Sequence, residues 1–205
     1  SGACMENIEY HADRKLDKAL LTRLSTCNYI HEKHNIVILG ASGAGKTSLL
    51  KAVSGSGPLS AGRVLVEGRD VTRLPPEGRD TVLLAQRPLL FPHLSVFENV
   101  AFPLRVRGVS RREVVQRVED VLASVRLEGF GPRRSHSLSG GQAHRVALAR
   151  AVVARPSVLL LDEPLTSLDP SLREEVRLSI LAVQEEYLPA LVLVTHDLDE
   201  AGRMA

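Results

Sequence analysis

The sequence contains no tryptophan, only 3% aromatic residues and only two cysteines, Cys4 and Cys27. The two cysteines match no metal-binding spacing, and a disulfide between them would require an oxidising compartment. No apolar run approaches the roughly 18 residues of a membrane span, so we expect no direct membrane insertion. The N-terminus lacks the apolar middle region of a signal peptide. A net charge of +2 is too small to indicate binding to nucleic acid or to an anionic membrane.

What remains is the composition of an ordinary globular domain, with 44% hydrophobic and 24% charged residues among 205. Short apolar runs alternate with segments of helical spacing, which predicts an α/β fold with a mostly parallel sheet flanked by helices. Residues 88–110 are rich in proline and glycine, and we assign no helix there. The expected elements are strands at 35–39, 81–85, 158–161 and 190–194, helices at 13–27, 46–53, 112–127 and 172–186, a helix that opens in 138–142 and runs to about 154, and a hairpin at 63–71.

A glycine-rich loop follows the first expected strand. Residues 40–47, GASGAGKT, match the pattern G-x-x-x-x-G-K-[ST] between a strand and a helix, which predicts a P-loop NTPase. Its glycines allow backbone N–H groups to surround phosphates, and the helix N-terminus favours their negative charge. We expect Lys46 to reach the terminal phosphates and the Thr47 hydroxyl to bind Mg²⁺. The residues expected to bind the nucleotide here are Gly40, Ser42, Gly43, Ala44, Gly45, Lys46, Thr47 and Ser48.

An acidic pair ends the apolar strand expected at 158–161. Because Asp162 directly follows this strand, its carboxylate should emerge at the carboxyl edge of the sheet, near the glycine loop, where it can hold Mg²⁺. Glu163 is the next residue, and in a strand it would face a different way, toward the position of an attacking water. We expect Glu163 to orient or polarise that water.

The segment 138–142, LSGGQ, opens another helix. Ser139, Gly140 and Gly141 present a hydroxyl and unobstructed N–H groups at the helix start, which is an anion site. In a chain that already has a P-loop, a second anion site suggests that it serves a different nucleotide. Taken alone, the segment would be interpreted as a Ser-Gly-Gly loop with an N-cap.

These motifs, with SLD at 167–169 and VTHD at 194–197, occur in the order that resembles the ATPase subunits of ABC transporters. The resemblance covers about 40–205 and implies ATP and Mg²⁺ as cofactors. It also implies an ATP-driven homodimer, in which the segment Leu138–Gln142 of each subunit closes on the γ-phosphate held by its partner.

The same resemblance assigns roles to single residues. Gln86 resembles the glutamine that contacts Mg²⁺ or water and senses the transmembrane partner. His196 resembles the histidine that bonds the γ-phosphate. Asp169 resembles the aspartate that crosses the dimer interface. The stretch 86–104 is similar to importer ATPases that serve small solutes.

On this basis, residues 1–205 form one P-loop ATPase domain. A RecA-like core comprises 40–86 and 138–205, a helical subdomain comprises 87–137, and 1–39 is a helical lead-in with the first strand. The expected partners are a second ATPase subunit and transmembrane permease subunits, with no nucleic acid. The expected location is the cytoplasm, at the inner face of the plasma membrane.

The beginning of the chain departs from the family. Residues 4–39 resemble the lead-in to the P-loop of IstB/DnaC-like AAA+ ATPases, so the chain looks composite. Two alternatives therefore stay open: an IstB-like ATPase that assists DNA transposition, and an ABC ATPase without a transporter. Because the family's N-terminal strands are absent from the pattern, we expect an incomplete antiparallel β subdomain, no aromatic platform for adenine, and little preference for ATP over GTP.

Overall fold

The computed structural model describes residues 35–41, 43–59, 61–87, 89–166 and 168–204. The helix expected at 13–27 and both cysteines lie outside these ranges. Within them, no helix combines the length and the apolar character needed to cross a bilayer.

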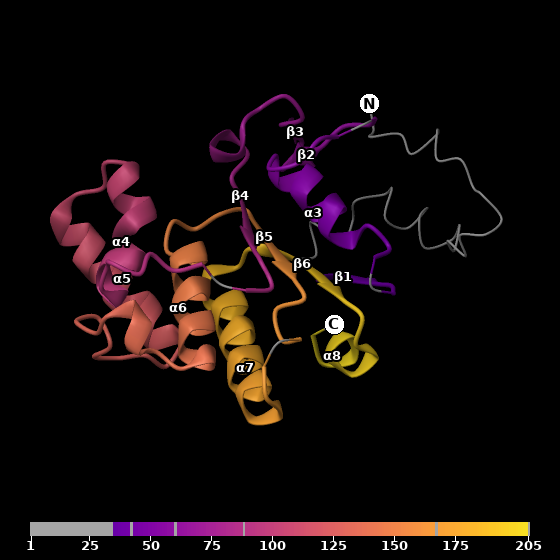
Figure 1. Cartoon of the computed structure of the whole chain (residues 1–205). Coiled ribbons are helices and arrows are strands. Elements are labelled where there is room, and N and C mark those ends of the chain that lie inside the picture. Colours follow the sequence, from indigo (N-terminus) through magenta and orange to yellow (C-terminus); the bar gives the residue numbers. More distant parts are fainter. Residues whose placement is uncertain (1–34, 42, 60, 88, 167, 205) are drawn as a thin grey trace.

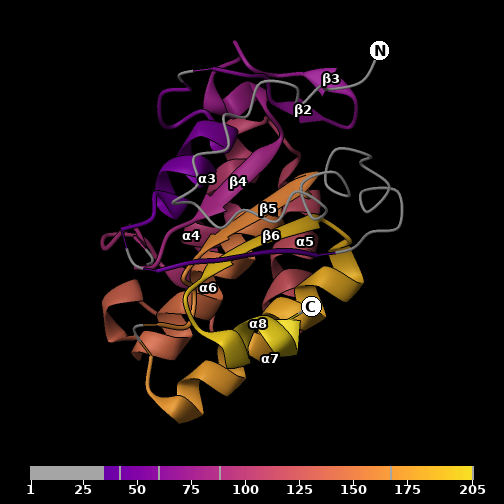
Figure 2. The same cartoon turned by 90° about the vertical axis from the view of Figure 1, so that its right-hand side faces the viewer.

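A parallel sheet forms the centre of the molecule. Its strands are β1 (Ile36–Leu39), β6 (Ala190–Thr195), β5 (Val158–Asp162) and β4 (Thr81–Leu84), in that spatial order, and every neighbouring pair is parallel. Figures 1 and 2 show β4, β5 and β6 side by side. The four expected strands are thereby confirmed, as is the α/β fold class. A separate hairpin pairs β2 (Leu65–Val66) with β3 (Arg69–Asp70).

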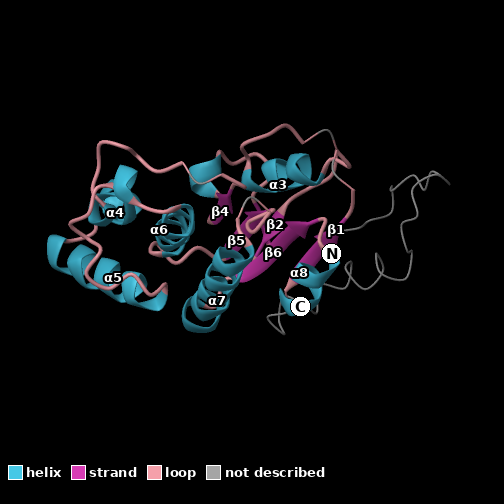
Figure 3. Ribbon diagram, turned by 60° about the horizontal axis from the view of Figure 1, so that its bottom comes forward, coloured by secondary structure: helices cyan, strands magenta, loops and turns pink. Residues whose placement is uncertain are grey.

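Helices cover both faces of the sheet. Helix α3 (Lys46–Ser54) lies on one face, whereas α6 (Gly140–Val152) and α7 (Pro170–Tyr187) lie on the other (Figure 3). Since side chains alternate along a strand, neighbouring residues of β5 enter different cores. Leu160 packs with Leu50 of α3, and Leu159 and Leu161 join the larger cluster beneath α6 and α7.

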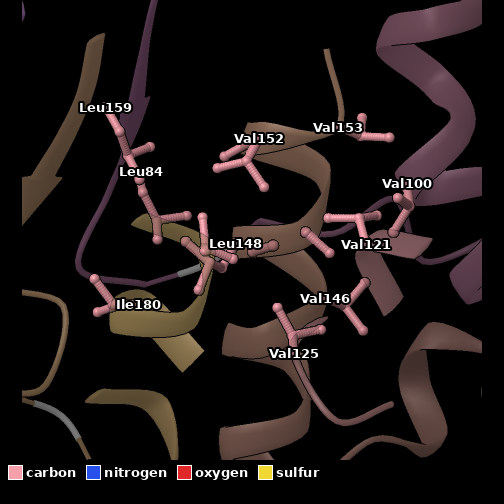
Figure 4. Packing of buried hydrophobic residues seen from close by; sticks show 14 of the residues in the cluster. Leu84, Val100, Val121, Val125, Val146, Leu148, Val152, Val153, Leu159 and Ile180 are labelled. Carbon is pink, nitrogen blue, oxygen red and sulfur yellow. The ribbon is translucent and has the colours of Figure 1, made fainter. Parts of the chain in front are cut away.

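The larger cluster continues into the helical part of the chain. Helices α4 (Val96–Val106) and α5 (Arg111–Ser124) pack on α6, and their valines meet Val146 and Val152 in a continuous apolar interior (Figure 4). Sequence pattern assigned no individual helix to 88–110, and α4 occupies residues 96–106 of that stretch. A capping box starts α4, because the Ser95 hydroxyl accepts from the Glu98 N–H at 3.2 Å while the Glu98 carboxylate accepts from the Ser95 N–H.

The hairpin and the end of α3 are joined by one buried cation. Arg79 is 6% exposed, and its guanidinium donates to the carbonyl oxygens of Thr72, Leu74, Ala52 and Val53 at 2.7–3.0 Å. Four carbonyl acceptors satisfy this charge, and they connect the segment after β3 with the last turn of α3. A further helix that we did not expect, α8 (Leu198–Met204), follows β6.

Candidate functional site

The strand register aligns the ends of three neighbouring strands. Leu39 of β1 lies opposite Thr195 of β6, and Val194 lies opposite Asp162 of β5. The residues that follow these ends therefore meet at one edge of the sheet. They are the glycine loop, Glu163 and the loop that carries His196.

The glycine loop has the conformation its sequence predicts. Gly43 and Gly45 have φ angles of 83° and 84°, in the left-handed region that glycine adopts without strain. Helix α3 starts at Lys46, which is 8% exposed, and its ammonium donates to the carbonyl oxygens of Gly40 and Ala41, the latter at 2.9 Å. Of the other residues assigned to this loop, Ala44 donates its N–H to the Ala41 carbonyl at 3.2 Å, Ser48 lies exposed in α3, and Ser42 is outside the described residues.

Two oxygen ligands lie together beside the loop. The Thr47 hydroxyl donates to Oδ1 of Asp162 at 3.0 Å, and Asp162 is the last residue of β5 and 7% exposed. Hydroxyl and carboxylate oxygens are the hard ligands that Mg²⁺ prefers. In the described part of the chain no cluster of three His, Cys, Asp or Glu side chains could hold a metal, so other oxygens would have to complete the coordination.

Glu163 lies between a lysine and a histidine. Its Oε1 is 3.3 Å from Nδ1 of His196 and 3.9 Å from Nζ of Lys46, and the carboxylate side chain is 17% exposed. We expected Glu163 to face its site as a strand residue, and this was wrong. The strand ends at Asp162, and Glu163 has a φ of 47°, although its N–H still bonds the Val194 carbonyl at 2.9 Å. The left-handed turn, rather than strand alternation, sets the direction of its side chain.

The loop around His196 is held by residues that sequence analysis missed. The Thr195 hydroxyl donates to Oε2 of Glu200 at 2.6 Å and accepts from the Asp197 N–H at 3.1 Å. Oδ1 of Asp197 accepts from the N–H groups of Asp199 and Glu200, and these two bonds lower the pKa of Asp197. Burial raises the pKa of Glu200. The only signal in the sequence was the position of these residues beside His196.

The segment 138–142 (LSGGQ), which we call the signature segment, is ordered by its own contacts. Ser139 caps α6, because its hydroxyl accepts from the Gln142 N–H at 3.3 Å while Oε1 of Gln142 accepts from the Ser139 N–H at 3.1 Å. A Cβ on Gly141 would lie 3.0 Å from Leu172 of α7, so glycine permits the close packing of these two helices, whereas the space beside Gly140 is open. Within the described residues, no hydrogen bond or ion pair joins this segment to the glycine loop, Asp162, Glu163 or His196.

Gln86 is exposed and lies two residues beyond β4. Hydrogen bonds from α6 hold the segment that follows it. Arg150 of α6 donates to the Leu89 carbonyl at 2.6 Å and to Oδ1 of Asn99 at 3.4 Å. Asn99 is fully buried and accepts from the Phe91 N–H at 2.8 Å. Sequence analysis missed both Arg150 and Asn99, although a buried asparagine in an apolar helix needs such partners.

Asp169 lies at the start of α7 and is exposed. Its carbonyl accepts from the Arg173 N–H at 2.9 Å, and its carboxylate makes no capping bond. The carboxylate is therefore available to other groups at this surface.

Comparison with known proteins settles the family. The model of the ABC transporter family matches residues 25–166, which is more than half of the chain. The chain belongs to the ABC transporter family. The match begins before the glycine loop, so it includes residues 25–39, which we had compared with AAA+ helper ATPases. The predicted family is confirmed, and membership implies ATP binding.

Curated relatives add detail. The spermidine/putrescine import ATP-binding protein PotA of Photobacterium profundum is 46% identical over 176 residues, covering 86% of this chain and 47% of the relative. The protein of the same name from Hahella chejuensis is 44% identical over 176 residues, covering 86% of this chain and 48% of the relative. The chain thus spans about half the length of the curated relatives it matches.

A solved structure agrees with the fold. The ATP-binding cassette MJ0796, in a dimeric post-hydrolysis state bound to ADP and Pi, superposes with a TM-score of 0.72 and 30% identity. The match covers 84% of this chain and 79% of MJ0796.

Proposed function

We infer that this chain is the ATP-hydrolysing subunit of an ABC importer for polyamines. The observation that carries the ATPase function is the grouping of Lys46, Thr47, Asp162, Glu163 and His196 at one edge of the sheet. These side chains come from three separate segments, and each is a residue type that ATP hydrolysis requires.

Phosphate binding rests on the glycine loop. Its backbone N–H groups, the start of α3 and the Lys46 ammonium together surround the phosphates of ATP with positive charge. On binding, Lys46 exchanges its bonds to loop carbonyls for bonds to phosphate oxygens. Thr47 and Asp162 would hold Mg²⁺, directly or through water, and phosphate oxygens complete its coordination. A magnesium ion held by these residues would supply positive charge that offsets the charge of the phosphates.

Glu163 and His196 act on the reacting groups. The Glu163 carboxylate accepts a hydrogen bond from the attacking water and directs its oxygen at the terminal phosphorus. His196, 3.3 Å from this carboxylate and 40% exposed, donates to the terminal phosphate. The new bond joins water oxygen to phosphorus, the bond to ADP breaks, and the phosphate leaves with the water's protons shared between it and solvent.

A second subunit completes the site. Ser139, Gly140 and Gly141 present a hydroxyl and N–H groups at the start of α6, and within the described residues they serve no group of the glycine loop. ATP bound at one subunit's loop is therefore closed by the partner's signature segment, and Asp169 crosses that interface. By the family resemblance, Gln86 would help to hold Mg²⁺ or its water and would signal the state of the site to the permease. The assembly operates at the inner face of the plasma membrane.

The transported solute is inferred from similarity. Both named relatives are spermidine/putrescine import ATP-binding proteins. An ATPase subunit does not bind the solute itself, so polyamine import follows from pairing with a polyamine permease rather than from any side chain described here.

Steady-state ATP hydrolysis by the purified chain tests this proposal. We expect Mg²⁺-dependent hydrolysis that is lost in Glu163→Gln and kept in Glu174→Gln, since Glu174 is a surface carboxylate paired with Arg177. Added double-stranded DNA should leave the rate unchanged. Stimulation by DNA would instead support the transposition helper, and equal rates in both variants would contradict the assigned site.

A further inference from the structure

Three residues around His196 bond one another in a closed cycle. The Thr195 hydroxyl donates to Oε2 of Glu200 at 2.6 Å, and the Glu200 N–H donates to Oδ1 of Asp197 at 3.2 Å. The Asp197 N–H then donates to the Thr195 hydroxyl oxygen at 3.1 Å. This cycle joins the end of β6 to the first turn of α8. Because His196 lies between Thr195 and Asp197 in the sequence, the cycle fixes the backbone on both sides of it.

The His196 imidazole itself takes no part in the cycle. Its Nδ1 lies 3.3 Å from Oε1 of Glu163, and its side chain is 40% exposed. Within the ranges that the structure describes, no hydrogen bond holds the ring, so its direction depends on the backbone of the loop. A group that donates to a reacting phosphate acts best when it is aimed before the nucleotide arrives. The cycle can supply this aim.

The Thr195–Glu200 pair is not explained by folding alone. Thr195 is fully buried and Glu200 is 7% exposed, and Oε1 of Glu200 has no hydrogen-bond partner among the described residues. A buried carboxyl group with one oxygen left unbonded destabilises a fold. Apolar side chains of the same shape could replace such a pair with little change in stability. The polar pair therefore points to a role in the loop that carries His196.

We propose that Thr195 and Glu200 are positioning residues for His196. Their hydrogen bond closes the cycle and keeps the ring within reach of Glu163 and of the terminal phosphate. Both side chains are buried, so they act through His196 rather than by contact with ATP. The proposal rests on the proposed function, in which His196 donates to that phosphate.

A double-mutant cycle in steady-state ATP hydrolysis tests this role. Glu200→Met keeps the volume of the side chain and removes the acceptor, so kcat should fall about tenfold or more with little change in KM. In a His196→Ala background the same substitution should cause no further loss, because no ring remains to be positioned. An equal loss in both backgrounds would mean that Glu200 only stabilises the fold, and it would overturn the proposal.

Matched variants separate the hydrogen bond from the charge. Glu200→Gln keeps an acceptor for the Thr195 hydroxyl and should retain kcat within about threefold, since a neutral acceptor loses only part of the bond strength. Asp199→Ala removes an exposed carboxylate from the same turn of α8 and should match the parent. Circular dichroism verifies folding. If Glu200→Met does not fold, Thr195→Val/Glu200→Met replaces both partners by apolar groups and is judged by the same criteria.

The NMR signal of the His196 ring separates this proposal from the proposed function. The ε1 C–H signal, assigned by its loss in His196→Ala, should shift in Glu200→Met and stay near its parent position in Glu200→Gln at the same pH. If His196→Ala keeps the parent turnover, the role of His196 in the proposed function fails, but a shifted signal still supports positioning by Glu200. An unshifted signal in folded Glu200→Met overturns the positioning proposal at any turnover.

Discussion

The sheet edge and the signature segment differ in how they are completed. At the sheet edge, Thr47 and Asp162 bond each other, and Glu163 lies between Lys46 and His196, so one subunit already brings together the groups that we propose to face a nucleotide. The signature segment also has its own hydrogen bonds, but the side chains of Ser139 and Gln142 each accept from the other's backbone N–H across the start of α6. Under the proposed function, the sheet edge would bind a nucleotide within one subunit, whereas the signature segment would contact the nucleotide of a second subunit.

The largest expected effect comes from Glu163→Gln. An amide keeps the size of the side chain but cannot act as a base, so turnover should fall about 10²–10⁴-fold while nucleotide binding is kept. Single-turnover hydrolysis and equilibrium binding of a fluorescent ATP analogue measure the two quantities. A parent-like rate would show that the sheet edge does not contain the group that positions water.

Arg79→Ala should damage the framework behind the sheet edge. Loss of the guanidinium removes a donor from four carbonyls of α3 and of the loop after β3, at an expected cost of about 2–4 kcal/mol in the free energy of unfolding. Urea denaturation measures this cost. The control Arg69→Ala removes an exposed arginine and should change the free energy by less than about 0.5 kcal/mol. Equal losses of unfolding free energy in the two variants would show that the hydrogen bonds of Arg79 do not stabilise the fold.

Ser139→Ala tests the role of the signature segment independently of the sheet edge. The lost N-cap should cost about 1 kcal/mol of stability. ATP binding by the single subunit should stay unchanged, because Ser139 contacts nothing at the sheet edge among the described residues, whereas turnover should fall.

The matched control for this variant is Ser110→Ala, which removes a comparable N-cap from α5. It should lose similar stability and keep its turnover. If the two serine variants lose turnover equally, the effect arises from destabilisation alone and the comparison between the two regions fails.

The smallest effect concerns pH. Burial raises the pKa of Glu200 above its ordinary value, with the Asp197 charge acting in the same direction and the Thr195 bond, His196 and Arg173 opposing it. Between the ordinary carboxyl pKa and the raised one, the folded chain binds a proton that the unfolded chain has released. The parent should therefore lose stability as pH rises through this window, and Glu200→Gln should lose less.

Unfolding midpoints in urea from pH 4 to pH 8 measure this difference. The lowered pKa of Asp197 acts at more acidic pH, where stability falls as the pH decreases, so the two effects occupy separate windows. Identical slopes for the parent and Glu200→Gln would contradict the burial of a charged Glu200.

Much of this arrangement was predictable because it depends on local pattern. The glycine loop, the acidic pair and the histidine each directly follow an apolar strand, and the carboxyl ends of parallel strands meet at one edge. The direction of Glu163 was not predictable, because it depends on a left-handed turn that a glutamate rarely adopts.

Other features escaped prediction because tertiary contacts decide them. Because Pro103 lies inside α4, the sequence pattern did not predict this helix, although the residues of its capping box were present in the sequence. Apart from Arg150, which donates to Asn99, the hydrogen-bond partners of Arg79 and Asn99 are backbone carbonyls and N–H groups, which cannot be recognised from residue type. The exposure of Asp169 likewise depends on how α7 packs.

Sedimentation of Glu163→Gln with and without Mg-ATP tests the central claim, that one region is complete and the other awaits a partner. We expect a monomer without nucleotide and a dimer with Mg-ATP. The double variant Glu163→Gln/Ser139→Ala should bind ATP but should no longer form that dimer. A monomer under both conditions, at ATP concentrations that saturate the glycine loop, would contradict the claim.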